Sequence, residues 1–382
     1  MSQADDLSST DLTGIVTQPD PRAAQEQIVT QGNVRVSVLT DTLIRLEYAH
    51  DGVFEDRASL AVVNRRFPTT KIRSTMKDNS LTVDTGAVTV RCSDVTRPFT
   101  RITLTAETKR GDSEWSYGMA DRKNLGGTVR TLDGWDGNKV ARFLRWDDET
   151  GVVNAWDEQG LGEGLCTRGD WTVFDDSGTV VLDPSTGGRA AKGRPWPTER
   201  EPGKRQDLYL FAYGTDHVGA LRDASRLFGP QPLPPRFAFG YWYSRYYPYT
   251  SEELIEVAAE LDQHRVPADV LVIDMDWHKL GWTGYSWDTD LFPDPTATLT
   301  AIHEHGLRTC LNLHPADGVG SHEDAFPEMC AAMGLDPATT DKVPFDLTDT
   351  RFVDAYLRLL HHPHEDRGVD FWWMDWQQGT ET

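Results

Sequence analysis

The hydrophobic pattern of this chain changes its period at a proline-rich segment, residues 229–235. Before this segment apolar and polar residues alternate in short runs, whereas after it apolar runs alternate with stretches of 3.6-residue periodicity. The two patterns bury different surfaces, so we expect them to build two domains with separate cores. For a chain of 382 residues we predict a flexible N-terminus over residues 1–25, a β-domain over 26–228 and an α/β domain over 229–382.

The first half predicts antiparallel sheets. Alternating apolar runs, punctuated by Gly, Asp, Asn and Thr, occur at residues 34–38, 44–48, 88–90 and 102–104. Such runs are typical of strands with one buried face and one face in water. The sequence Asp-Asp-Ser-Gly at residues 175–178, between two apolar runs, predicts a hairpin turn. We therefore expect a β-sandwich.

The second half predicts a parallel sheet. Four apolar segments read as strands: residues 237–243, 269–273, 307–313 and 369–373. Helices are expected between them from Thr250, where Thr250 and Glu253 form a capping-box pattern, over residues 295–305, and around 323–333 and 352–360. Alternation of buried strands with helices is typical of βαβ units, in which functional side chains follow the strands.

The ends of the predicted strands are polar or aromatic. Asp274 and Asp276 follow the second strand, His314 the third, and Asp375 the fourth, with Trp and Met between them. An aspartate after a strand often caps the next helix, and this is the alternative to a chemical role for each. Carboxylates among aromatic rings are costly unless they are paired or used in chemistry. For Asp276 we favour orientation of the loop.

Composition excludes several classes of function. The 38 Lys and Arg against 60 Asp and Glu give a net charge of −22, which argues against binding to nucleic acid or anionic membrane. No apolar run approaches the roughly 20 residues of a membrane span. Neither a G-x-G-x-x-G after the first strand of the second half nor a P-loop is present. The 13 tryptophans and the acidic strand ends fit cleavage of glycosides, which needs carboxylates and aromatic walls.

Cysteine and histidine positions indicate neither disulfides nor a metal site. Cys92, Cys166, Cys310 and Cys330 are far apart and form no C-x-x-C pair, which fits a reducing cytoplasm, and no export signal is visible. The histidine clusters at residues 303–305 and 361–364 are interpreted as structural. We predict no cofactor.

The ordered motifs of the second half resemble glycoside hydrolase family 31, which includes α-glucosidases and α-xylosidases. The resemblance rests on residues 237–246, 273–277, 292–295 and 368–375. It implies a multidomain α/β protein: a β-sandwich of the galactose-mutarotase type, followed by the first half of a (β/α)8 barrel. It also implies retaining hydrolysis of terminal α-linked sugars, most readily α-glucosides, with no nucleic-acid or membrane partner. A homo-oligomer is left open.

The resemblance assigns roles to individual residues. Asp375 matches the family nucleophile, Asp274 the residue that binds sugar hydroxyls with Met275 beside it, and Trp373 a wall of the same subsite.

Four further residues are weaker candidates for contact with sugar. Arg168 and Asp170 resemble an R-D-G-W element on a sandwich loop that reaches the pocket, with Gly and Asp transposed here. His314 and Trp287 are expected to contact sugar, against the alternatives of a polar rim and of packing.

The chain departs from the family pattern after the nucleophile. Residues 376–379 read Trp-Gln-Gln-Gly, where many members have M-N-E, and the sequence ends seven residues after Asp375. A complete barrel takes about 250 residues. We therefore expect a fragment without the general acid/base, which would be inactive alone.

Several alternative functions stay open. They are an inactive sugar-binding remnant, an α-xylosidase, an α-galactosidase or a transglycosylase of the same family. Outside the family, a metal-dependent hydrolase would use His278, His314 and Asp274 as ligands.

Overall fold

The computed structural model describes residues 20–109, 111, 113–127, 146–147, 152–153, 163–185 and 195–375. Residues 1–19, most of the segment expected to be a loose N-terminus, lie outside the described residues. Contacts divide the chain into two units, which are treated separately below. The β unit comprises Met1–Asp183 and Pro197–Pro232, and the α/β unit comprises Pro184–Trp196 and Leu233–Thr382.

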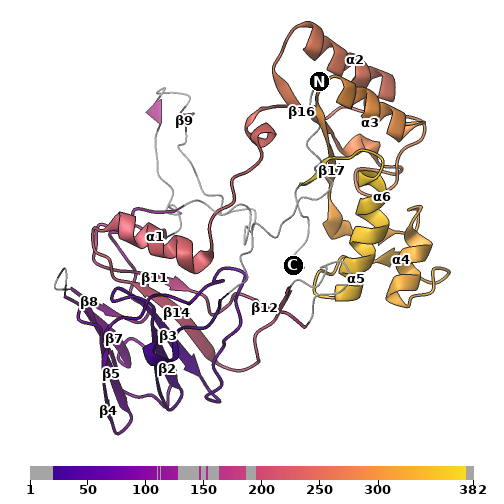
Figure 1. The fold of residues 1–382 in the computed structure, drawn as a ribbon. Coiled ribbons are helices and arrows are strands. Elements are labelled where there is room, and N and C mark those ends of the chain that lie inside the picture. Colours follow the sequence, from indigo (N-terminus) through magenta and orange to yellow (C-terminus); the bar gives the residue numbers. More distant parts are fainter. Residues whose placement is uncertain are drawn as a thin grey trace. The chain divides into compact units, whose positions relative to one another are not determined.

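Two five-stranded antiparallel sheets build the β unit (Figure 1). The first has the order β1-β2-β3-β14-β11, with β1 Ile28–Gln31, β2 Val34–Val38, β3 Leu43–Ala49, β14 Arg205–Phe211 and β11 Thr172–Asp175. The second has the order β4-β5-β6-β7-β8, with β4 Arg73–Lys77, β5 Ser80–Asp84, β6 Val88–Cys92, β7 Leu104–Thr108 and β8 Ser113–Ser116. Apolar side chains from both sheets, such as Val36 and Val90, share one buried cluster. The unit is a β-sandwich.

The first sheet is buried on both faces, which contradicts the expectation of one face in water. Every residue of β2 and β3 is buried, whereas buried and half-buried residues alternate along β5 and β7 of the second sheet. The outer face of the first sheet is covered because helix α1 (His217–Phe228) packs with Leu43, Tyr209 and Phe211 in a second cluster. Helix α1 therefore adds a third layer.

Charged side chains are buried in this first sheet as ion pairs. Arg35 Nε lies 2.6 Å from Glu47, and Arg45 Nη2 lies 2.7 Å from Asp207 and 3.0 Å from Glu47. Arg200 also reaches Asp207, at 3.0 Å. Burial is tolerated because each charge has partners of opposite sign within hydrogen-bond distance. The pKa of Asp207 is held well below its usual value by Arg45 against the opposing effect of burial.

Two local predictions for the β unit were wrong. The turn at residues 175–178 forms, with Thr179 N–H donating to Asp176 O at 3.1 Å. The flanking strands do not make a hairpin, since β11 pairs with β14. Asp176, within this turn, is fully buried and lies 2.9 Å from Arg200 instead of facing water. Ile102 is exposed in a turn, and β7 begins only at Leu104.

A four-stranded parallel sheet organises the α/β unit. Its order is β15-β16-β17-β20, with β15 Tyr241–Tyr243, β16 Ala268–Ile273, β17 Arg308–Leu313 and β20 Phe371–Met374. The helices are α2 Ser251–Gln263, α3 Pro295–Glu304, α4 Phe326–Met333, α5 Thr350–Ala355 and α6 His362–Glu365. The predicted strand–helix alternation is confirmed. The capping box is confirmed too: Glu253 N–H donates to Thr250 Oγ1 and Thr250 N–H to Glu253 Oε2.

Two predicted elements are broken into pieces. The expected strand over 237–243 is a 3₁₀ turn, Arg236–Phe239, followed by the short strand β15. The expected helix over 352–360 begins earlier, as α5, and continues as a π-helical turn, Tyr356–His361, into α6. The wider turn accompanies the burial of Tyr356, Leu360 and His361.

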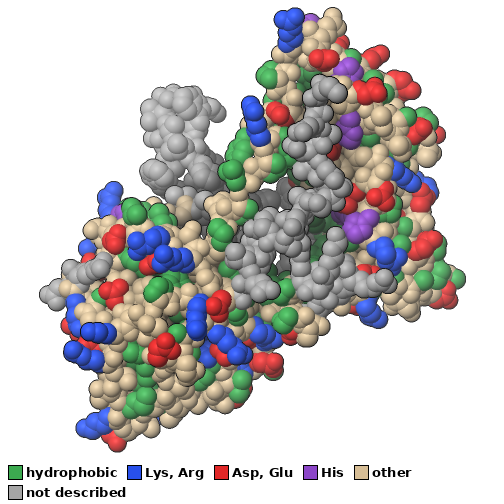
Figure 2. All heavy atoms as spheres, in the orientation of Figure 1, with side chains coloured by type: hydrophobic (Ala, Val, Ile, Leu, Met, Phe, Trp, Pro, Cys, Tyr) green, Lys and Arg blue, Asp and Glu red, His purple; other side chains and the backbone are tan. Residues whose placement is uncertain are grey.

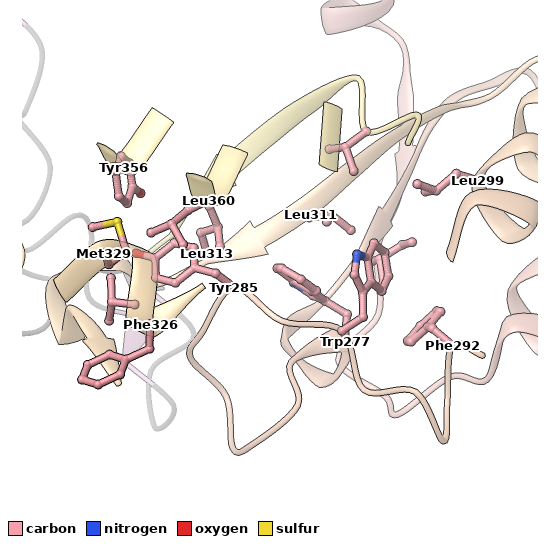
Figure 3. Packing of buried hydrophobic residues seen from close by; sticks show 14 of the residues in the cluster. Trp277, Tyr285, Phe292, Leu299, Leu311, Leu313, Phe326, Met329, Tyr356 and Leu360 are labelled. Atoms are coloured by element: carbon pink, nitrogen blue, oxygen red, sulfur yellow. The ribbon is translucent and has the colours of Figure 1, made fainter. Parts of the chain in front are cut away.

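The two faces of the parallel sheet differ in their packing. On one face Leu271, Ile273, Leu311 and Leu313 join the large cluster beneath the helices, part of which Figure 3 shows. On the other face a small cluster contains Val270, Val272 and Cys310, with Phe237, Trp242 and Phe371 packed against it. Because side chains alternate along a strand, Asn312 and Trp373 belong to this second face. We call it the inner face.

Charged side chains are scattered over the visible surface of both units, with acidic and basic groups interspersed (Figure 2). This distribution fits a solvated surface more than a binding device. Among the described residues, no helix combines the length and the apolar character needed to cross a membrane.

Candidate active site

Asp375 lies directly beyond β20, at the carboxyl end of the parallel sheet. Its backbone N–H donates to Leu313 O at 2.9 Å, so the ladder between β17 and β20 extends to this residue. Its Oδ2 accepts a hydrogen bond from Asn312 Nδ2 at 3.1 Å. The side chain is 43% exposed. The carboxylate is therefore fixed on one side and open to solvent on the other, as a group that reacts with a ligand must be.

Asn312 is a site residue that the sequence analysis missed. It is buried on β17, and Trp277 Nε1–H donates to its carbonyl oxygen at 2.9 Å. Trp277 is fully buried in the cluster beneath the helices (Figure 3). The available signal was the two-residue period of a strand, which puts the amide at residue 312 on the same face as Cys310 and His314, between the apolar Leu311 and Leu313.

His314 follows β17 and lies close to Asp375. Its Nε2 is 3.9 Å from Asp375 Oδ2, too far for a direct hydrogen bond. Its ring meets Trp282 edge to face, with centroids 4.6 Å apart. The imidazole is buried, whereas Trp282 is 39% exposed. The structure thus places His314 between the carboxylate and an aromatic surface.

Asp274 caps a short 3₁₀ turn, Met275–Trp277, at the end of β16. Its Oδ1 accepts from Met275 N–H at 2.8 Å, which is the capping alternative to a purely chemical role. Met275 is half-buried in the same turn. Asp276 Oδ2 is buried and has no hydrogen-bond partner among the described residues. Burial, and then the charge of Asp274, raise the pKa of Asp276 above its ordinary value.

The two predicted tryptophans have different environments. Trp373 is 38% exposed on the inner face and contacts Trp242 edge to face, at 6.4 Å between centroids. Trp287 is buried, and its ring centroid lies 4.9 Å from that of Trp277. Its indole N–H donates to His364 Nδ1 at 3.0 Å. Trp373 can still present a ring to a ligand. The burial of Trp287 favours the packing alternative.

His278, the first of the histidines considered as metal ligands, is buried. It is 3% exposed, and neither ring nitrogen has a hydrogen-bond partner among the described residues. Burial, followed by the neighbouring His314, lowers its pKa to about 3. In the part of the chain that the structure describes, no group of three or more His, Cys, Asp or Glu side chains is placed to hold a metal ion.

Arg168 and Asp170 belong to the β unit. Arg168 N–H donates to Lys123 O at 2.8 Å, and Asp170 O accepts from Gly214 N–H at 3.1 Å. These bonds fix the backbone of the loop before β11. The contact of this loop with the sugar pocket stays a prediction.

The α/β unit matches a known family. Residues 231–381 match the family model described as Glycosyl hydrolases family 31 TIM-barrel domain. This segment belongs to glycoside hydrolase family 31. The resemblance seen in the sequence motifs is thereby confirmed, and Asn312, His314 and Asp375 all lie inside the family 31 segment.

Similar proteins share this family. An alpha-xylosidase of Saccharolobus solfataricus is 28% identical over 176 residues, 46% of this chain and 23% of that protein. An alpha-xylosidase of Lactiplantibacillus pentosus is 32% identical over 188 residues, 46% of this chain and 24% of that protein. The solved family 31 dextranase of Flavobacterium johnsoniae, complexed with isomaltotriose, has a TM-score of 0.58 at 15% identity and covers 93% of this chain.

The matches cover only part of these relatives. The chain spans about a quarter of the length of the two xylosidases and 47% of the dextranase chain. At this identity the structural likeness shows the fold alone. The succession of a sheet-rich region and an α/β catalytic segment is that of family 31 enzymes.

Proposed function

We propose that this chain is part of a retaining, exo-acting α-glycosidase with Asp375 as its nucleophile. The observation that carries the proposal is the carboxylate of Asp375, bonded to Asn312 and still 43% exposed at the carboxyl end of the family 31 sheet. A nucleophile in such a sheet needs both a fixed orientation and an approach for the anomeric carbon.

The proposed reaction has two displacements. A carboxylate oxygen of Asp375 bonds to the anomeric carbon as the α-glycosidic C–O bond breaks, and the leaving oxygen takes a proton from a general acid. Water then attacks the same carbon, its proton passes to the conjugate base, and the carboxylate leaves with the α-configuration retained. Asp274 and Trp373 would hold the sugar, with Met275 beside them. We assign no residue of this chain to the acid/base role.

The sugar is proposed as an α-glucoside or an α-xyloside. The α-glucoside follows from the sequence resemblance, and the α-xyloside is supported by the two relatives named as xylosidases. The two sugars differ by the hydroxymethyl group at C5. One methylene alone is worth about 10- to 200-fold in kcat/KM, so a pocket shaped to one of the sugars should favour it by at least about 10-fold.

Further parts of the proposal concern context. We propose a galactose-mutarotase-like topology for the sandwich, the first half of an eight-stranded barrel for the α/β unit, and a cytoplasmic location. The loop with Arg168 and Asp170 is proposed to contribute to the sugar pocket, as the resemblance implies.

Nitrophenyl α-glycosides and a mechanism-based label test the function in the full-length gene product that contains this chain. The panel should include α-glucoside, α-xyloside and α-galactoside, and 5-fluoroglycosyl fluorides of the same sugars should label Asp375, as found by peptide mass spectrometry. Asp375→Asn should abolish turnover and labelling, whereas Asp366→Asn, at an exposed position directly after α6, should leave both unchanged.

Three results would contradict the proposal. Labelling of another carboxylate would refute the assignment of Asp375. A folded protein that neither cleaves nor is labelled, yet binds sugar, would establish the alternative of a carbohydrate-binding remnant. Loss of activity with a chelator would favour a metal-dependent hydrolase.

A further inference from the structure

The side-chain amide of Asn312 donates a hydrogen bond to the carboxylate of Asp375. The Nδ2···Oδ2 distance is 3.1 Å, within the range of a hydrogen bond, whereas His314 Nε2 is 3.9 Å away from the same oxygen. A carboxylate oxygen accepts, so the amide of Asn312 must turn its nitrogen toward Asp375. The amide of Asn312 is thus in place to hold Oδ2 of Asp375.

We infer that Asn312 is a positioning residue for the nucleophile, an inference that rests on the proposed function. The carboxylate of Asp375 is free to rotate about its terminal bond unless one oxygen is held. The bond from Asn312 fixes one oxygen and thereby sets the carboxylate plane that the anomeric carbon meets. Orientation of this kind acts on the chemical step, where a misplacement of about 1 Å can cost about 100-fold in rate.

The position of Asn312 is itself fixed from the opposite side of the sheet. Trp277 Nε1–H holds the carbonyl of Asn312 at 2.9 Å, and the backbone of Asp375 is bonded to the next residue, Leu313, at 2.9 Å. Trp277 is fully buried. Donor and acceptor are therefore built on one rigid ladder, and the amide cannot drift away from the carboxylate without disturbing the sheet.

The buried amide has a feature that a purely structural role does not explain. Asn312 is 3% exposed, and its Oδ1 has no hydrogen-bond partner among the described residues. Burying an unpaired carbonyl oxygen costs about 1–3 kcal/mol. An apolar residue of the same size would avoid this cost on a strand whose neighbours, Leu311 and Leu313, are apolar. The hydrogen bond to Asp375 gives a reason for an amide here.

Two substitutions separate positioning from packing. Asn312→Leu keeps the branched shape, with larger methyl groups and no donor, and Asn312→Asp keeps the shape and size but donates only when protonated. We expect Asn312→Leu to lower kcat and the rate of labelling by a 5-fluoroglycosyl fluoride about 10- to 100-fold, with KM within twofold. Asn312→Asp should be slower still at pH 7 and should recover part of the labelling rate as the pH falls toward 5.5.

A matched control lies at the other end of the same strand. Thr309 is fully buried on β17 and donates from Oγ1 to Gly368 O at 2.9 Å, so Thr309→Val also removes one buried hydrogen bond. We expect this variant to lose stability while its labelling rate per folded molecule is unchanged. Near-UV circular dichroism measures the folded fraction of each variant.

The outcomes distinguish the inference from the function on which it rests. Wild-type protein that is not labelled at Asp375 refutes the proposed function. Labelled wild type with an unchanged rate in Asn312→Leu refutes the inference alone, as does an effect on KM without an effect on kcat. If both Asn312 variants lose their folded signal, Asn312 is a structural residue and the inference is wrong.

Discussion

His364 is held as a neutral imidazole by its two hydrogen-bond partners. Trp287 Nε1–H, which can only donate, points at His364 Nδ1 at 3.0 Å, so Nδ1 carries no proton. Nε2 then carries the proton and donates to Tyr285 O at 2.8 Å. Protonation of Nδ1 would set two donors against each other in a buried site. Burial lowers the pKa of His364 to about 4.

Two more histidines of the α/β unit also have a lowered pKa. Burial lowers the pKa of His278 and of His361 to about 3. Because a histidine in the unfolded chain titrates near pH 6.5, the unfolded state binds more protons than the folded state between pH 6.5 and these lower values. Stability is therefore full above about pH 6.5 and falls as the pH drops. From pH 7 to pH 5 each histidine removes about 2 kcal/mol of unfolding free energy, or about 6 kcal/mol for three.

Urea unfolding at pH 7, 6 and 5, followed by tryptophan fluorescence, measures this loss. The ring of His361 lies between those of Tyr356 and Trp372 in tilted and edge-to-face contacts, with centroids 4.4 and 4.5 Å away, so His361→Phe removes the titrating group and keeps an aromatic ring. We expect this variant to lose about 2 kcal/mol less than wild type between pH 7 and pH 5. His264→Gln, at an exposed position, should behave as wild type. Equal losses in wild type and His361→Phe would refute the reasoning.

Three further substitutions test the packing described above. Asp207→Asn leaves the buried Arg45 without its closest charge partner and should cost the β unit about 3–5 kcal/mol in urea unfolding; a loss below 1 kcal/mol would mean that the network is not tightly coupled. Thr250→Ala removes the capping box of α2 and should lower the unfolding free energy by about 1 kcal/mol, with Thr300→Ala, on the exposed side of α3, as its comparison. Gly318→Ala places a Cβ against Val343 O at a backbone φ of +74° and should cost more than about 1 kcal/mol, with an unchanged melting temperature counting against the geometry.

The sequence predicted the parallel sheet well because its strands carry long apolar runs. The periodicity after residue 235, the capping box at Thr250 and the polar residues at the strand ends all had local signals. Those signals placed Asp274, His314 and Asp375 after consecutive strands of one sheet, as the structure has them.

What the sequence could not predict depends on pairings between distant residues. Arg45 and Glu47 were expected on the solvent-exposed face of a strand. Their burial is tolerated because Arg45 pairs with both Glu47 and Asp207, which is 162 residues away from Arg45. The same holds for Asn312, whose polar side chain is explained only by its hydrogen bond to Asp375, which follows another strand. Trp287 carried an aromatic signal that packing and sugar binding share, and its contact with His364 lies 77 residues further along.

The hydrogen bond from Trp277 to the carbonyl of Asn312 connects Asp375 to the packed interior of the α/β unit. Protein engineers would therefore treat this interior and the exposed aromatic rings near Asp375 differently. Trp277 belongs to the packed interior, so a change there is transmitted to the alignment of Asp375 through a single strand. Trp282 and Trp373 have partly exposed rings, which meet His314 and Trp242 edge to face outside the packed interior. Libraries aimed at new sugars can therefore vary these two rings while the interior is kept constant, and libraries aimed at thermostability should leave Trp277 alone.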